Sequence, residues 1–87
     1  ELGGIKYFPS IYQSLGYIYT GLNLYDKATK FFQKALKLNP DATSYVDMAF
    51  IYWTTGEKEE ALHYCKKALK AEPENNMALE IIRELKL

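Results

Sequence analysis

Apolar residues recur at three- and four-residue steps in four successive stretches of this 87-residue chain, a pattern that predicts amphipathic helices. The first stretch has its apolar positions at Ile11, Tyr12, Leu15, Ile18, Tyr19 and Leu22. The next three run over residues 28–38, 45–52 and 61–69, and a last helix is expected from about residue 75 to residue 87. No stretch alternates with the two-residue period of a strand, so the pattern predicts an all-α protein with five helices.

Turn-forming residues separate these apolar stretches. Asn23 is a break after the first helix, and the segment Asn39-Pro40-Asp41 ends the second because the residue before a proline is pushed out of the helical region. Thr54-Thr55-Gly56 turns the chain after the third helix, and Glu72-Pro73 closes the fourth. The first four helices are therefore expected to form two antiparallel pairs.

The two pairs are copies of one plan at an offset of 33 residues. The offset places Tyr12 on Tyr45, Leu15 on Met48, Gly16 on Ala49, Tyr19 on Tyr52, Ala28 on Ala61, Phe32 on Cys65, Ala35 on Ala68 and Pro40 on Pro73. We divide the chain into an N-terminal extension (1–8), a first unit (9–41), a second unit (42–74) and a C-terminal helix (75–87). The small residues in this set are expected where paired helices cross closely, since larger side chains would strain the core.

The residues of the first unit resemble the tetratricopeptide repeat family. They match its motif of an aromatic residue, Leu-Gly, Tyr, Ala, Phe and Pro at Tyr12, Leu15-Gly16, Tyr19, Ala28, Phe32 and Pro40. The second unit departs from the motif at Met48, Ala49 and Cys65. The resemblance implies a right-handed α-α superhelix of two helix pairs, followed by a helix that caps the array or begins a further repeat.

The resemblance also implies that the first helix of each pair lines a concave groove, which holds a peptide or a partner helix. The residues expected there are Gln13, Tyr17 and Thr20 on the first helix and, 33 positions on, Val46, Phe50 and Trp53, with Asp47 and Thr43 beside them. Phe50 and Trp53 lie away from the expected core stripe, and exposed aromatic residues favour partner contacts. The expected function is a protein–protein interaction module.

Other interpretations stay open. Phe50 and Trp53 could instead pack on the N-terminal segment 5–8 of the same chain. The domain could be a structural segment of a longer repeat array, or a self-association module, with no ligand of its own. Stacking of nucleic-acid bases on Tyr17, Phe50 and Trp53 would need a basic groove, and Asp47 lies among these aromatic residues.

The charge balance gives no drive toward nucleic acid or membrane, because eleven basic residues meet eleven acidic ones. The lysines at 27, 30, 34 and 37 could meet an acidic partner or phosphates, but a solvated outer face is the favoured interpretation. His63 and Cys65 point in different directions on one helix, and Cys65 occupies a core position. We therefore expect no enzyme, no metal and no cofactor, and the lone cysteine fits an intracellular, cytoplasmic location.

The C-terminal helix carries more apolar residues than one packing face needs. We expect Ala78, Leu79 and Ile82 to face the second unit, which leaves Met77, Ile81 and Leu85 toward the open side. These three residues could support self-association into a homo-oligomer, or contact a further repeat.

Overall fold

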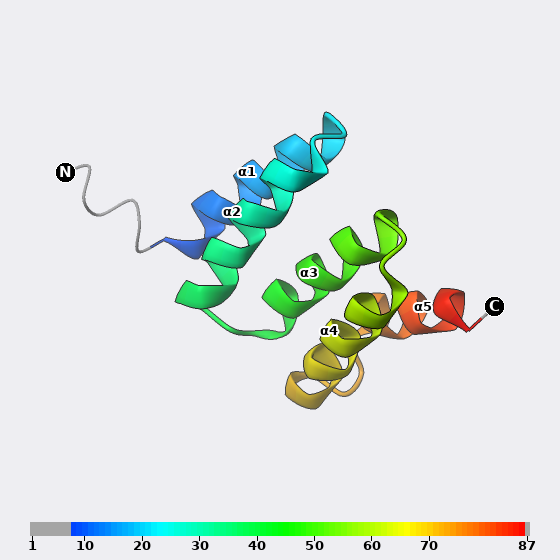
Figure 1. The fold of residues 1–87 in the computed structure, drawn as a ribbon. Coiled ribbons are helices and arrows are strands. Elements are labelled where there is room, and N and C mark those ends of the chain that lie inside the picture. The colour runs from blue at the N-terminus through cyan, green and yellow to red at the C-terminus, as the bar shows by residue number, and fades with distance from the viewer. Residues whose placement is uncertain (1–7, 87) are drawn as a thin grey trace.

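The computed structural model describes residues 8–86, which form five α-helices and no strand in that range (Figure 1). The helices are α1 (Pro9–Gly21), α2 (Tyr25–Leu38), α3 (Ala42–Thr54), α4 (Lys58–Ala71) and α5 (Asn76–Leu85). The prediction of five helices and an all-α fold is confirmed.

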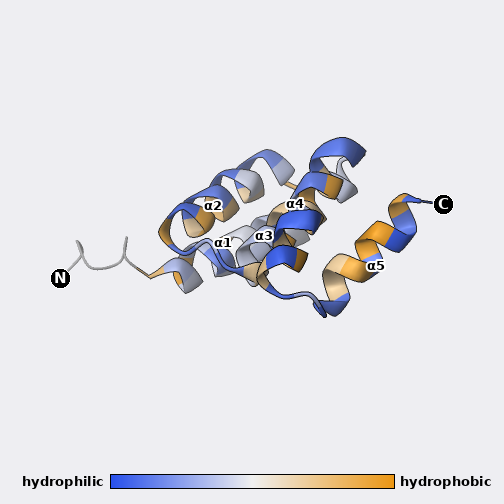
Figure 2. Ribbon diagram, turned by 90° about the horizontal axis from the view of Figure 1, so that it is seen from below, coloured by the Kyte–Doolittle hydropathy of each residue, from blue (hydrophilic) through white to orange (hydrophobic). Residues whose placement is uncertain are grey.

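Two helical hairpins make up most of the molecule. Figure 1 shows α1 and α2 side by side, then α3 and α4, with α5 at the far end from the N-terminus. Helix α3 is central, because it contacts α2 of the first hairpin, α4 of its own hairpin, and α5. In Figure 2, α2 and α4 alternate between strongly hydrophilic and hydrophobic stretches, as expected for helices with one face in the core and one in water.

The two hairpin turns have the same geometry, 33 residues apart. Asn23 has φ 62° and Gly56 has φ 85°, so both adopt the left-handed conformation that ends many helices. After each of them an N–H reaches back into the preceding helix: Leu24 donates to the Tyr19 carbonyl at 2.9 Å, and Glu57 donates to the Tyr52 carbonyl at 2.8 Å. The repeat in the sequence is thus a repeat in backbone geometry.

The helices α3 and α5 begin alike. The carboxylate of Asp41 accepts from the Ser44 N–H, and the amide oxygen of Asn75 accepts from the Ala78 N–H, each at 2.9 Å. These side chains satisfy one of the amides that a helix start leaves unpaired. Aligned on these caps, α5 occupies the place that the first helix of a third repeat would take.

The core has two parts. One cluster joins the hairpins, since Ala28 and Phe32 of α2 pack with Met48 and Ile51 of α3. The other holds α5 onto the second hairpin through the buried residues Val46, Ala49, Cys65, Ala68, Ala78 and Ile81. The sequence predicted this role correctly for the small residues, and Ala28, Ala49 and Ala61 have no exposed surface.

Gly16 lies directly against Phe32. A Cβ atom added to Gly16 would come 2.4 Å from Cε1 of the Phe32 ring, well inside van der Waals contact. In the second unit the equivalent residues are Ala49 and Cys65, both fully buried in one cluster. The departures from the repeat motif therefore compensate each other: where the ring is replaced by a smaller thiol, the glycine is replaced by a larger alanine.

One part of the predicted core stripe is wrong. Ile11 and Ile18 of α1 are exposed, and so is Leu22 just after the helix, with Ile18 57% and Leu22 61% accessible. Ser44 and Ile51, the equivalents of Ile11 and Ile18 on α3, are buried because α2 lies beside that face of α3, whereas Thr55, the equivalent of Leu22, is exposed. Among residues 8–86, no helix takes the corresponding place beside α1.

The predicted facing of α5 is correct for Ala78, Ile82 and Met77 and wrong for the other three residues. Ile81 is 1% exposed and Leu85 packs against the core, whereas Leu79 is 41% exposed. The buried side of α5 consists of Ala78, Ile81, Ile82 and Leu85, at helical steps of three, one and three residues. Docking this side covers three large apolar side chains, Ile81, Ile82 and Leu85, whereas the expected side carries only two, which favours the observed facing. The exposed side of α5 carries its charged residues together with Met77 and Leu79.

Candidate binding groove

A hollow of about 430 Å³ lies between the first helices of the repeats. Helix α1 contributes one side chain, α3 contributes four, and the start of α5 contributes two: Tyr17, Thr43, Val46, Asp47, Phe50, Asn75 and Met77. Five of the eight residues named for the groove, Thr43 among them, therefore meet in one place. Its surface is predominantly apolar, which suits the recognition of a ligand by shape with a few polar contacts.

Tyr17 forms one wall of the hollow. Its hydroxyl donates a 2.8 Å hydrogen bond to Asp47 Oδ1, and its ring meets the Phe32 ring edge-on with centroids 5.3 Å apart. The side chain is nevertheless 52% exposed. The sequence predicted that Tyr17 would lie outside the core stripe. Its side chain is half exposed, but it also contacts Phe32 in the core and bonds to Asp47.

Asp47 lies at the floor of the hollow and is only 7% exposed. Its second carboxylate oxygen, Oδ2, is buried and has no hydrogen-bond partner among the described residues. Burial raises the pKa of Asp47 to about 6, against the lowering effect of the Tyr17 hydrogen bond and with a smaller contribution from Asp41. The pKa of Tyr17 is also raised, first by burial and then by the adjacent carboxylate.

Phe50 and Trp53 form an aromatic pair along α3. Their rings meet edge-on with centroids 5.9 Å apart. Phe50 is half-buried against the core and lines the hollow, whereas Trp53 is 36% exposed and lies outside the lining. Of the N-terminal segment that could have covered them, residues 5–7 lie outside the described residues, and Phe8 is 56% exposed.

The remaining groove residues on α1 do not line the hollow. Gln13 and Thr20 are half-buried, and the Thr20 hydroxyl donates to the Gly16 carbonyl of its own helix at 2.8 Å. Val46 lines the hollow but is 8% exposed, so it offers little surface.

Sequence reasoning missed Asn75 and assigned Met77 to a different surface. Met77 is 46% exposed, as expected, but it lies at the edge of the hollow near Phe50. The starts of α3 and α5 could have indicated this role for Met77. When the capping residue Asn75 is aligned with the capping residue Asp41, Met77 falls on Thr43, which also lines the hollow.

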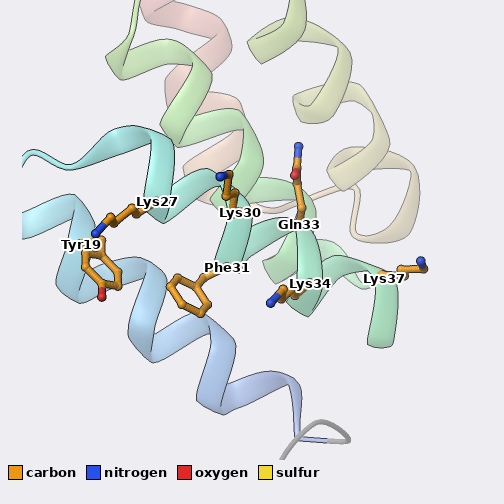
Figure 3. A pocket seen from close by; sticks show the side chains of 7 residues that line it. All are labelled: Tyr19, Lys27, Lys30, Phe31, Gln33, Lys34 and Lys37. Atoms are coloured by element: carbon orange, nitrogen blue, oxygen red, sulfur yellow. The ribbon is translucent and has the colours of Figure 1, made fainter.

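A second hollow, of about 510 Å³, lies on the outer side of the first hairpin (Figure 3). Tyr19 of α1 and six residues of α2 line it: Lys27, Lys30, Phe31, Gln33, Lys34 and Lys37. The Lys27 ammonium lies 5.6 Å from the centre of the Tyr19 ring, and that of Lys34 lies 5.7 Å from the Phe31 ring. In Figure 3, Lys27 reaches toward Tyr19, whereas Lys37 points away from the rings. The four lysines therefore form a basic face beside the aromatic rings of Tyr19 and Phe31.

The cysteine and histidine do not form a site. Cys65 is buried and burial raises its pKa to about 11, so it stays a protonated thiol near neutral pH. His63 is exposed on the same helix. In the part of the chain that the structure describes, no three metal-binding side chains gather in one place.

Comparison with protein families agrees with this geometry. One tetratricopeptide repeat model matches residues 9–41 and a second matches residues 42–75. The chain belongs to the tetratricopeptide repeat family. Its hairpins and capping helix form the right-handed superhelix of tetratricopeptide repeats, and such repeats are generally protein–protein interaction modules. A search of curated proteins found no match to the chain. None of the helices described for this tetratricopeptide domain is long and apolar enough to cross a membrane.

Proposed function

We propose that the domain binds an extended peptide or a partner helix in the hollow between α1, α3 and the start of α5. The observation that carries the proposal is the lining itself: Tyr17, Phe50 and Met77 expose apolar surface around a single polar floor residue, Asp47. Aromatic and methionine side chains are enriched in the cores of protein interfaces. Trp53 extends this surface along α3 beyond the hollow.

We propose that the domain binds its partner without catalysing a reaction. The hollow is open on one side and holds no arrangement of a nucleophile with a base, so we assign the domain no catalytic role and no cofactor. We also propose an intracellular role, in which the reduced thiol of Cys65 remains in the core.

A second candidate function follows from the exposed apolar stripe of α1. Ile11 and Ile18 occupy the face that, on α3, receives α2 of the preceding hairpin. This observation favours a role as a segment of a longer array, or as a self-associating unit joined through α1. The C-terminal helix is the weaker surface for self-association, because Ile81 and Leu85 are used in the core and Met77 borders the hollow.

The test of the proposed function is a double variant, Phe50→Ala with Trp53→Ala, compared with the wild type for binding of peptides selected from a random linear library. We expect loss of binding with helical content near that of the wild type. The matched control is Lys27→Ala with Lys34→Ala, which removes two large side chains from the opposite surface. Equal loss of binding in the control variant would contradict the groove assignment.

A further inference from the structure

We propose that the hollow selects a partner through a basic side chain, lysine or arginine, whose cationic group binds Asp47. This inference rests on the proposed function, because it names the chemistry of the peptide that the same hollow receives.

One oxygen of the Asp47 carboxylate has no hydrogen-bond partner among the described residues. Oδ1 of Asp47 accepts from the Tyr17 hydroxyl at 2.8 Å, but Oδ2 has no donor among residues 8–86 and is buried. A buried carboxylate oxygen without a partner is costly, and a donor that reaches it regains the lost hydrogen bond. A charged donor gains most, because hydrogen bonds between ions are stronger than those between neutral groups.

No cationic side chain among the described lining residues competes with a guest for Asp47. Among the seven described side chains that line the hollow, Asp47 is the one with a charge. Asn75 uses its amide oxygen on the Ala78 N–H and its amide nitrogen on Glu72, so its polar atoms are already paired. Asp41 lies close enough to raise the pKa of Asp47 further. The field in the hollow therefore favours a positive guest and opposes a negative one.

The lining also suits the aliphatic part of a lysine or arginine side chain. The lining beside Asp47 includes Tyr17 and Phe50, whose rings offer aromatic surface. Lysine and arginine bury their methylene stems against such surfaces while the charged head reaches a polar group. Aromatic faces beside the path add cation–π attraction. A short cation such as ammonium would gain the charge pairing but not these contacts.

Access to Oδ2 requires a movement of a neighbouring side chain, because this oxygen is buried in the unbound domain. Tyr17 lines the hollow, bonds the other oxygen of the same carboxylate, and has a side chain that is 52% exposed. We expect its ring to shift as the guest enters while its hydroxyl keeps the bond to Oδ1, so that the guest's N–H group adds a donor at Oδ2.

The experiment uses three capped tripeptides that differ at the central residue: acetyl-Ala-Lys-Leu-amide, acetyl-Ala-Nle-Leu-amide with norleucine, and acetyl-Ala-Glu-Leu-amide. Norleucine keeps most of the aliphatic stem of lysine and lacks the charge. Affinities are measured by NMR chemical shifts of Thr43, Val46 and Met77 in the wild-type chain and in Asp47→Asn. The pKa of Asp47 is followed with and without the lysine peptide.

We expect the lysine peptide to bind about tenfold more tightly than the norleucine peptide, and the glutamate peptide to bind most weakly. Asp47→Asn should remove the difference between lysine and norleucine, and the lysine peptide should lower the pKa of Asp47 in the wild type. Equal binding of lysine and norleucine by the wild type, or a lysine preference that survives in Asp47→Asn, would overturn the inference while leaving the groove as a peptide site. No shift with any of the three peptides would overturn both the inference and the proposed function.

Discussion

The Tyr17 hydroxyl donates a 2.8 Å hydrogen bond to Asp47, and this bond joins the first helices of two repeats across 30 residues of sequence. It fixes an exposed ring at the edge of the groove and keeps an acidic group in its floor. Because burial raises the pKa of Asp47, we expect the stability of the domain to depend on pH.

The first prediction concerns that dependence. Burial raises the pKa of Asp47 from 3.8 in the unfolded chain to about 6 in the folded domain, so the folded state holds the proton more tightly. The contribution of Asp47 to the free energy of unfolding is therefore full below about pH 4 and is lost as the pH rises through about 6. The difference corresponds to roughly 3 kcal/mol at most.

The measurement is chemical denaturation of the wild type and Asp47→Asn between pH 4 and pH 7. The variant lacks the titrating group, so its free energy of unfolding should fall less over this range than that of the wild type. Two parallel stability curves would show that Asp47 does not carry the effect.

The second prediction concerns the contact of Gly16 with Phe32. Gly16→Ala should lower the free energy of unfolding by roughly 1–3 kcal/mol, because the added methyl group would collide with the buried ring. In a Phe32→Cys background, which copies the Ala49–Cys65 pair of the second unit, the same change should cost much less. A double-mutant cycle by urea denaturation measures this coupling, and additive effects would argue against it.

The third prediction concerns the two left-handed turn residues. Gly56→Ala should destabilise the domain by about 1 kcal/mol, because a residue with a Cβ is strained at φ 85°. Asn23→Gly should be neutral or slightly stabilising, while Asn23→Ala should be destabilising, because alanine lacks both the tolerance for this conformation and the amide that accepts from the Tyr25 hydroxyl. Thermal unfolding of the three variants checks the order, and an alanine variant at either position as stable as the wild type would contradict it.

Much of this architecture could be predicted from the sequence, because the repeat fixes helix boundaries and turns twice over. The register that aligns Asn23 with Gly56 and Gly16 with Ala49 is a direct consequence of how the hairpins close. What failed was the assignment of faces at the two ends of the array. Ile18 fits a core stripe as well as Ile51 does, and only the presence of α2 beside α3 makes the latter buried.

The groove was predicted in part for the same reason. Side-chain spacing identified Tyr17, Asp47 and Phe50 as neighbours on the first helices, but spacing within a helix cannot show a hydrogen bond between two helices. Met77 was placed on the open side of α5 because its contribution to the hollow depends on how α5 docks against α3. Contacts between elements, rather than periodicity within them, decided each of these residues.

The measurement that tests the central claim most directly is a map of where a bound peptide lies. Linear peptides are selected from a random library on the wild-type domain, and the tightest is titrated into isotope-labelled protein while backbone and methyl signals are recorded. We predict that the largest changes fall on Tyr17, Thr43, Phe50, Trp53 and Met77, with small changes on the outer faces of α2 and α4. Changes centred on the lysine-lined hollow at Lys27 and Lys34, or on the exposed stripe of α1 at Ile18 and Leu22, would contradict the account.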